Sequence, residues 1–303
     1  MDIAIMLEGQ NGLNWPRFQR IAHAVEDLGF AGLYRSDHFT NAQPPDSDSL
    51  ELWVSLTWLA SHTKRIEFGP MVSPVSFRNP VFTARIAKDV DDLSGGRLTL
   101  GIGAGWQERE HTNFGFNLLD LPERFARFQE GLAVITRLLQ SEEPVNFTGQ
   151  YFHLQDATLL PHAQRPGGPP ILIGGNGEKQ TLPLVARYAN EWNGVFLSAG
   201  RYAELSRHLD ELLAAQGRKP GDVRRSLMTG LLFGRTDAEL EQKLQKAGQS
   251  AEAMRTRGMV VGTANALGEQ LGKLAGVGIQ RVMLQWMDLD DIAGLEALAK
   301  AVL

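Results

Sequence analysis

The sequence predicts an α/β protein with the (β/α)8 barrel fold, built as a single domain over residues 1–303. Short apolar runs alternate along the chain with amphipathic stretches, which makes eight strand–helix units. The predicted strands have little internal polarity, as expected for a parallel sheet that helices cover. An open, doubly wound sheet is the alternative, but eight units in a chain of this length favour a closed barrel.

The eight predicted strands are short runs of apolar residues, several of which end at glycine or at a polar residue. Such runs, bounded by turn residues, are typical of buried strands. In chain order they are Asp2–Leu7, Ala31–Ser36, Arg65–Val72, Arg97–Ile102, Ile171–Gly174, Glu191–Leu197, Leu227–Phe233 and Gln280–Gln285.

Apolar residues at helical spacing predict a helix after each strand. In the first helix they include Phe18, Ile21 and Val25, and Gly29 then ends the helix as a C-cap. The predicted helices are Trp15–Leu28, Leu50–Ser61, Pro80–Leu93, Pro122–Leu139, Glu178–Tyr188, Arg201–Gln216, Asp237–Ala247 and Asp288–Val302, with Ala264–Ala275 as a further helix before the last strand.

Two stretches interrupt this alternation, and both are interpreted as insertions within the one domain. The first, about residues 143–170, contains an alternating run around Thr148 and Gly149 that predicts a β-hairpin. The second, about residues 246–261, is polar and contains methionine. We expect these insertions and the loop after the first strand to shape the substrate pocket.

Composition excludes several classes of protein. The chain has 30 basic and 35 acidic residues and no basic stripe, so no nucleic-acid partner is expected. The absence of cysteine excludes thiolate catalysis, Cys-zinc sites and iron–sulfur clusters. The histidines lack metal-ligand spacing, and we predict no metal site. No apolar run approaches the ~20 residues of a membrane helix, and the first residues do not resemble a signal peptide, so we expect a cytoplasmic protein without membrane contact.

Two glycine-rich segments follow predicted strands, where a parallel barrel binds its ligands. The turn Gly174–Gly177 joins a strand to a helix, and amides at such a helix start bind phosphate, although an ordinary tight turn is the alternative. The segment Gly101–Gly105 lacks the spacing of a dinucleotide fingerprint. Its glycines instead let a flat ring approach the backbone.

Asp37 and His38 place an acid and an imidazole at the end of the second strand. His38 is therefore a candidate for proton transfer near neutral pH, and the alternative is a histidine that only caps or packs. No lysine lies late in a predicted strand and no Gly-x-Ser-x-Gly motif occurs, so Schiff-base and serine-nucleophile chemistry are unsupported. A barrel with glycine-lined strand ends and aromatic residues suits a flavin-like cofactor.

Several segments together resemble one known family. They are Gly29–Phe39, Gly69–Pro74, Arg78–Pro80, Leu100–Trp106, Glu123–Phe125, Phe147–Phe152 and Ile173–Gly177. In this order they resemble the bacterial luciferase-like monooxygenase superfamily, and most of all its branch of coenzyme F420-dependent oxidoreductases. The resemblance runs nearly from end to end.

The resemblance implies a luciferase-like TIM barrel that binds F420, or alternatively FMN, at the C-terminal end of the barrel. It implies a bulge with a non-prolyl cis peptide between Met71 and Val72, which backs the deazaflavin ring. Asp37 and His38 would be the catalytic pair beside the ring, with His38 steadying or protonating it. The cofactor-binding residues that it implies are Met71, Val72, Asn79, Gly103, Ala104, Gly105, Trp106, Gly174, Gly175, Asn176 and Gly177.

One position departs from the pattern of the sugar-phosphate dehydrogenases in that branch. They carry a glutamate acid directly after the Gly-x-Gly of the fourth strand, where this chain has Trp106. Glu108 and Glu110 lie close by in the sequence and are expected to point elsewhere. The indole predicts a more apolar or planar substrate than glucose 6-phosphate.

The first functional hypothesis is an F420-dependent oxidoreductase that moves a hydride between the deazaflavin and a small organic substrate. The second is an FMN-dependent monooxygenase that uses oxygen and is fed by a separate flavin reductase. The third is a non-catalytic, flavin-binding barrel. The resemblance also implies a homodimer, with the helices after strands one to three at the interface.

Overall fold

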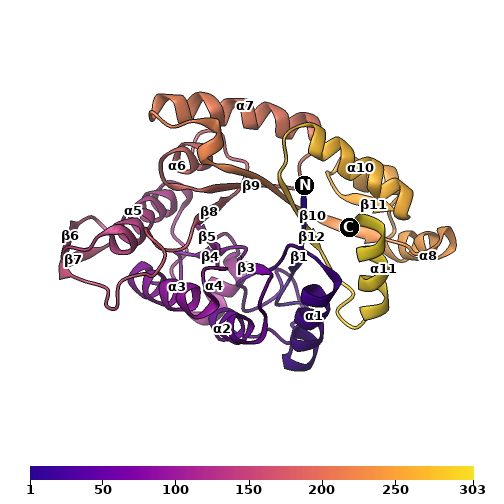
Figure 1. Ribbon diagram of the computed structural model, residues 1–303, viewed down its shortest axis with the longest axis horizontal. Helices are drawn as coiled ribbons and strands as arrows, with labels where there is room; N and C mark the ends of the chain where they lie inside the picture. The colour runs from indigo at the N-terminus through magenta and orange to yellow at the C-terminus, as the bar shows by residue number, and fades with distance from the viewer.

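In the computed structural model, which describes all 303 residues, parallel strands form a central barrel that helices surround (Figure 1). The strands pair in the order β3-β2-β1-β12-β10-β9-β8-β5-β4. Their bounds are β1 (Asp2–Leu7), β2 (Gly32–Arg35), β3 (Glu67–Pro70), β4 (Ser73–Pro74), β5 (Leu100–Gly103), β8 (Ile171–Gly174), β9 (Glu191–Val195), β10 (Arg224–Phe233) and β12 (Arg281–Gln285).

The barrel closes through its third strand, which is split in two. β3 pairs with β2, β4 pairs with β5, and the residues between them are Met71 and Val72. A parallel bridge between Phe68 and Leu98 joins β3 to the segment before β5. Counting β3 and β4 as one strand leaves the eight predicted strands, and the barrel prediction is confirmed.

A ring of helices covers the outside of the barrel (Figure 1). The helices are α1 (Trp15–Leu28), α2 (Leu52–His62), α3 (Pro80–Ser94), α5 (Leu121–Gln140), α6 (Thr181–Tyr188), α7 (Ala199–Ala215), α8 (Asp237–Ala247), α10 (Ala264–Gly276) and α11 (Ile292–Val302). The bounds of α1 and α8 are those predicted. α6 and α11 begin three and four residues later than predicted, at Thr181 rather than Glu178 and at Ile292 rather than Asp288.

The first helix shows how local sequence produces this layer. The side chain of Asn14 accepts a hydrogen bond from the Arg17 amide (3.2 Å), which satisfies one of the free donors at the helix start. Gly29 ends the helix with a left-handed φ of 95°. Phe18, Ile21 and Val25 are fully buried against the barrel, so one apolar stripe holds the helix in place.

The interior of the barrel is apolar in its middle and charged at the N-terminal ends of the strands. Met6, Met71, Met228 and Met283 belong to the interior cluster. At the N-terminal end of the barrel the buried guanidinium of Arg281 forms ion pairs with Glu67 and with Glu191. A polar plug therefore closes this end, and a ligand has access to the barrel from the opposite end.

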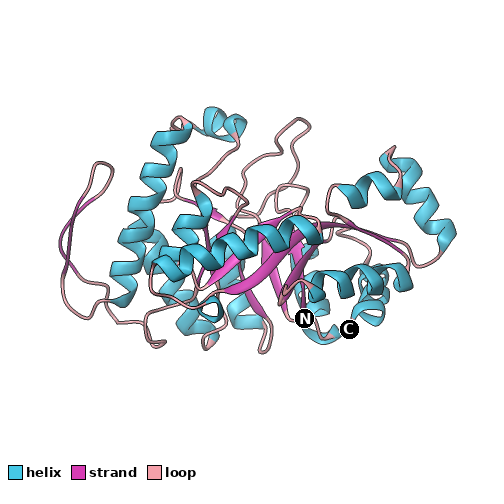
Figure 2. Cartoon of the chain, turned by 90° about the horizontal axis from the view of Figure 1, so that it is seen from above, coloured by secondary structure: helices cyan, strands magenta, loops and turns pink.

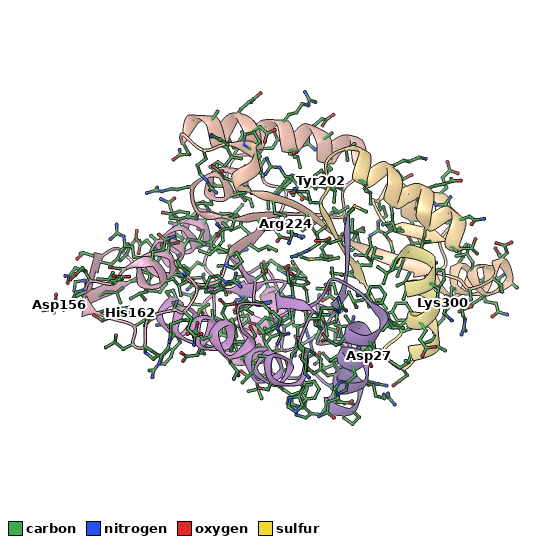
Figure 3. All side chains as sticks on the ribbon, viewed as in Figure 1. Asp27, Asp156, His162, Tyr202, Arg224 and Lys300 are labelled. Carbon is green, nitrogen blue, oxygen red and sulfur yellow. The ribbon has the colours of Figure 1, made fainter.

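The two insertions occupy different places. The first contains the predicted hairpin, formed by β6 (Val145–Thr148) and β7 (His153–Ala157), and projects beyond the helical ring (Figure 2). Asp156 and His162 mark its peripheral position (Figure 3). The second contains α9 (Ala251–Thr256) and leads into β11 (Val260–Gly262), which pairs with the C-terminal part of β10.

Two helices were not predicted: α9 in the second insertion, and α4 (Glu108–Phe114), a seven-residue helix between β5 and α5. None of the helices combines the length and the apolarity that crossing a membrane requires.

Candidate active site

A cavity of about 390 Å³ lies at the C-terminal strand ends, within the ~300–1,000 Å³ typical of ligand pockets. Residues at or just after the ends of β2, β3, β5, β8 and β9 line it, together with Met228 from the middle of β10 and residues of α4 and α5. Ten of the predicted site residues are among them: Asp37, His38, Met71, Val72, Gly103, Ala104, Gly105, Trp106, Gly174 and Gly175. No residue of either insertion lines this cavity, so the expectation that the insertions build its wall was wrong.

A larger and more open hollow of about 630 Å³ lies outside the barrel, beside α8 and the loop after β12. Its charged side chains pair with one another, as Arg17 does with Asp290 and Lys243 with Asp288. Because these charges are already compensated, the barrel cavity is the better candidate for chemistry.

The bulge of the third strand forms one wall of the barrel cavity. The peptide bond between Met71 and Val72 is cis, as the family resemblance implied. The side chain of Val72 lies against the backbone of the next strands: a Cβ added to Gly103 would stand 2.5 Å from Val72 Cγ2. Glycine at this strand end therefore makes room for Val72, and the two together present backbone and a methyl group to the cavity.

His38 is held by a glutamate that the sequence interpretation placed elsewhere. Its Nδ1–H donates to Glu110 Oε1 (3.0 Å), and the other carboxylate oxygen accepts the amide of Phe39 (3.0 Å). Glu110 is 1% exposed and lines the cavity. The expectation that Glu110 points away was wrong, because α4 turns its buried face toward the end of β2.

The hydrogen bond to Glu110 also affects the pKa of His38. Burial of the ring acts to lower its pKa, but the hydrogen bond to Glu110 and the negative charge of Glu110 outweigh burial, so the pKa of His38 is raised. The more distant carboxylates of Glu8 and Asp37 act in the same direction. Nε2 has no hydrogen-bond partner in the protein, so it is the nitrogen through which His38 can exchange a proton with a ligand.

Asp37 has a different surrounding. Its two oxygens accept hydrogen bonds from Arg78 Nη2 (2.7 Å) and Nε (2.9 Å), and Ser73 Oγ lies 3.2 Å away. Arg78 also pairs with Glu51 (2.7 Å). A bidentate pair of this kind fixes the orientation of both side chains. Asp37 therefore connects the end of β2 to the loop before α3.

The glycine turn after β8 leaves a run of backbone donors free. The amide of Gly175 donates to the carbonyl of Asn193, and the side chain of Asn176 binds both backbone groups of Val195. The carbonyl of Gly177 accepts the amide of Thr181. The amides of residues 176–180 make no hydrogen bond within the protein, so the free donors lie slightly later in the chain than predicted.

Three of the predicted cofactor residues do not line the cavity: Asn79, Asn176 and Gly177. Asn79 is the N-cap of α3 and accepts the amide of Val81 (2.9 Å). Trp106, in contrast, stands at the rim with 60% of its surface exposed. Its ring meets that of His38 edge-on, with centroids 5.5 Å apart.

Sequence reasoning missed several lining residues. Glu110 lies on a short helix without apolar periodicity, so its orientation had no signal in the sequence. The other missed residues are Pro74, Leu121, Arg124, Phe125, Val195 and Met228. Arg124 donates to the carbonyl of Leu119 (3.0 Å), with longer contacts to the carbonyls of Leu118 and Gly105.

The fold and the cavity define a TIM-barrel protein whose ligand site is formed by the C-terminal ends of the strands and by a bulged third strand. The chain belongs to the luciferase-like monooxygenase family, which it matches over residues 1–287.

The chain is similar to an F420-dependent glucose-6-phosphate dehydrogenase of Kineococcus radiotolerans, with 33% identity over 71% of this chain and 63% of the relative. It is 30% identical to a 4-hydroxyprotoasukamycin monooxygenase of Streptomyces nodosus subsp. asukaensis, over 67% of this chain and 52% of that one. The chain thus spans less than two thirds of the length of these relatives.

Among solved structures, an F420-dependent secondary alcohol dehydrogenase in complex with an F420–acetone adduct superposes with a TM-score of 0.86 at 18% identity. The match covers 99% of this chain and 98% of that one. At this identity the likeness supports the fold.

Proposed function

We propose that this chain is an F420-dependent oxidoreductase that transfers a hydride between the deazaflavin and a small organic substrate. The observation that carries the proposal is the position of His38. Glu110 holds it at the rim of a cavity whose wall is the cis bulge at Met71 and Val72. The relatives named for F420 use support the same cofactor.

The residues present fit such a cofactor. A flat ring can lie over the bulge at Met71 and Val72, because Gly103 and Gly174 have no side chains and leave room for that of Val72. The free amides of residues 176–180 suit an anionic tail, and the exposed side chain of Lys179 adds a positive charge there. When bound, the deazaflavin supplies the hydride chemistry.

The chain's own residues bind, orient and handle the proton. His38 has one nitrogen committed to Glu110, which orients the ring, and presents Nε2 to the cavity. A raised pKa keeps this nitrogen protonated over more of the neutral range, so His38 acts as the acid in the direction that reduces a substrate. Asp37 forms a bidentate ion pair with Arg78, and we assign Asp37 to positioning the loop before α3.

The proposal is tested by titrating the protein with F420 and following the quenching of deazaflavin fluorescence. We expect saturable binding below tens of micromolar. Lys179→Glu places a negative charge beside the free amides and should weaken F420 about tenfold or more. Lys64→Glu makes the same change on an exposed lysine at the other end of the barrel, and should leave the affinity unchanged.

The same titration with FMN separates the two cofactor hypotheses. An FMN-dependent monooxygenase would bind FMN in preference to F420 and would take reduced FMN from a separate flavin reductase. Saturable binding of FMN without binding of F420 therefore rejects our proposal in favour of that alternative.

We also propose a homodimer. Three of the exposed large apolar side chains, Val54, Phe82 and Leu93, lie on α2 and α3, the helices after the second and third strands. Light scattering should give twice the mass of one chain, and Phe82→Asp should shift the equilibrium toward the monomer. A monomer at all concentrations rejects this part.

A further inference from the structure

The start of α4 is attached to the loop after β2 by more than one side chain. Glu110 binds His38 and the amide of Phe39, as described above. Gln107, the residue directly before α4, donates from Nε2 to the carbonyl oxygen (2.9 Å) and to Oγ1 (3.1 Å) of Thr40. The site as proposed above assigns a role to Glu110 and none to Gln107.

The contact of Gln107 with the loop is buried, whereas a third contact is on the surface. Gln107 and Thr40 are 3% and 5% exposed, so removal of the amide donor would leave the Thr40 carbonyl unpaired in the interior. Arg109 donates to the carbonyl of Asn41 (2.8 Å) and pairs with Asp46 (2.7 Å), but the side chains of this pair are 26% and 45% exposed. Exposed ion pairs contribute little to stability. Gln107 therefore carries the larger part of this attachment.

α4 has few other means of keeping its position. It is seven residues long, and a helix of this length is not stable by itself. Its buried residues are Glu110 and His111, so it has no buried apolar side chain. The His111 ring donates from Nδ1 to the Gln107 carbonyl (2.7 Å), while the Gln107 side chain makes no cap hydrogen bond with the helix. Gln107 thus binds α4 through its backbone and the loop through its side chain.

This attachment bears on the distance between Glu110 and His38. Glu110 comes three residues after Gln107, and Thr40 comes two residues after His38, so the two contacts between α4 and the loop are neighbours. The distance from Glu110 Oε1 to His38 Nδ1 is 3.0 Å. At about 3.6 Å the contact would no longer be a hydrogen bond. A shift of the start of α4 by a fraction of an ångström away from Thr40 is therefore enough to break it.

We infer that Gln107 is a positioning residue for His38: by binding Thr40 it holds the start of α4 against the loop after β2, and so keeps Glu110 within hydrogen-bond range of His38. The inference deepens the proposed function and rests on it, because it takes His38 as the group that exchanges the proton. The contact between Glu110 and His38 is a property of the protein alone, so it can be measured without cofactor or substrate.

Gln107→Met removes the amide donor and keeps a side chain of similar length. NMR titration of the His38 ring, assigned from the signal that His38→Gln loses, reports whether Glu110 is still in place. Burial lowers the pKa of His38 and the carboxylates of Glu110, Glu8 and Asp37 raise it, and the substitution alters none of these groups directly. We expect the pKa of His38 to fall by at least half of the decrease that Glu110→Gln causes.

A double variant and a matched control separate positioning from a general loss of stability. If Gln107 acts through Glu110, adding Gln107→Met to Glu110→Gln lowers the pKa of His38 no further than Glu110→Gln alone. The control is Gln270→Met on α10, where the glutamine also donates to two backbone carbonyl oxygens (2.9 and 2.6 Å). This variant should lower the free energy of unfolding and leave the pKa of His38 unchanged.

An unchanged pKa of His38 in Gln107→Met overturns the inference, and so do additive decreases in the double variant or an equal decrease in Gln270→Met. If Gln107→Met does not fold, Gln107→Asn replaces it, since it draws the amide back by a methylene without removing it, and the same criteria apply. A failed F420 titration is a separate result, which rejects the proposed function and leaves these measurements on the protein alone as they stand.

Discussion

Replacing Glu110 by glutamine is the most informative single substitution, because it removes one charge and keeps the shape of the side chain. The amide oxygen can still accept the Phe39 amide, while the charge-assisted bond to His38 is lost. We expect the pKa of His38 to fall from its raised position, since burial, which lowers it, is then opposed by less negative charge.

The same substitution has a predictable cost in stability. A hydrogen bond to a charged group contributes about 1.5–3 kcal/mol, and both partners are largely buried, with 15% and 1% of their side chains exposed. A loss of about 2 kcal/mol, divided by an unfolding entropy of about 2.1 cal/mol/K per residue, lowers the melting temperature by about 3 °C for 303 residues.

The loss depends on pH, with a sign that the raised pKa determines. The folded protein binds the proton of His38 more tightly than the unfolded chain, so the pair's contribution is fully present below the usual histidine pKa of 6.5. It disappears as the pH rises through the raised pKa of the folded state. The difference in unfolding free energy between the parent protein and Glu110→Gln should therefore be largest near pH 5.5 and shrink toward pH 9.

NMR titration of the His38 ring and urea unfolding at several pH values measure the two effects. Glu108→Gln is the matched control: it lies on the same helix but is exposed, and should change neither quantity. An unchanged His38 pKa in Glu110→Gln, or a stability difference that grows with pH, would refute the reasoning.

Two further predictions concern the frame of the site. Arg78→Met leaves the Asp37 carboxylate buried without its bidentate partner, and urea unfolding should show a loss of about 3–5 kcal/mol, whereas a loss below about 1 kcal/mol would contradict the assigned pairing. Gly105→Ala places a Cβ 2.1 Å from Ser76 Oγ at a φ of 87°, while Gly115→Ala at a φ of 73° meets no atom within 4 Å. We expect Gly115→Ala to lower the free energy of unfolding by about 1–2 kcal/mol, and Gly105→Ala to lower it clearly more. Equal losses of stability in thermal unfolding would show that the close approach to Ser76 is unimportant.

The barrel could be predicted from the sequence because its signals are local. The apolar stripe of α1 and its Asn14 and Gly29 caps all lie within or next to the helix, so they predict it from its own stretch of sequence. The glycines at the strand ends could also be identified in the sequence. We could expect them to lie close together, because the C-terminal ends of parallel strands meet at one side of a barrel.

The partners of the site residues could not be predicted in the same way. Glu110 is recruited by contacts with His38 and Phe39, which are 72 and 71 residues away in the chain. Asn79 is different: an asparagine directly before a helix-starting proline is an N-cap signal, and here the cap role uses the side chain that was expected at the cofactor. Gly258 packs closely against the backbone of Phe196, and no pattern near residue 196 indicates this approach.

The central claim is that the C-terminal mouth of this barrel binds a deazaflavin. The most direct measurement is to purify the chain from a host that makes both F420 and FMN, and to identify by mass spectrometry which of them is retained. F420 should co-purify with the parent protein and be depleted in Lys179→Glu relative to Lys64→Glu. Retention of FMN alone, or of F420 in equal amounts in both variants, would contradict the account.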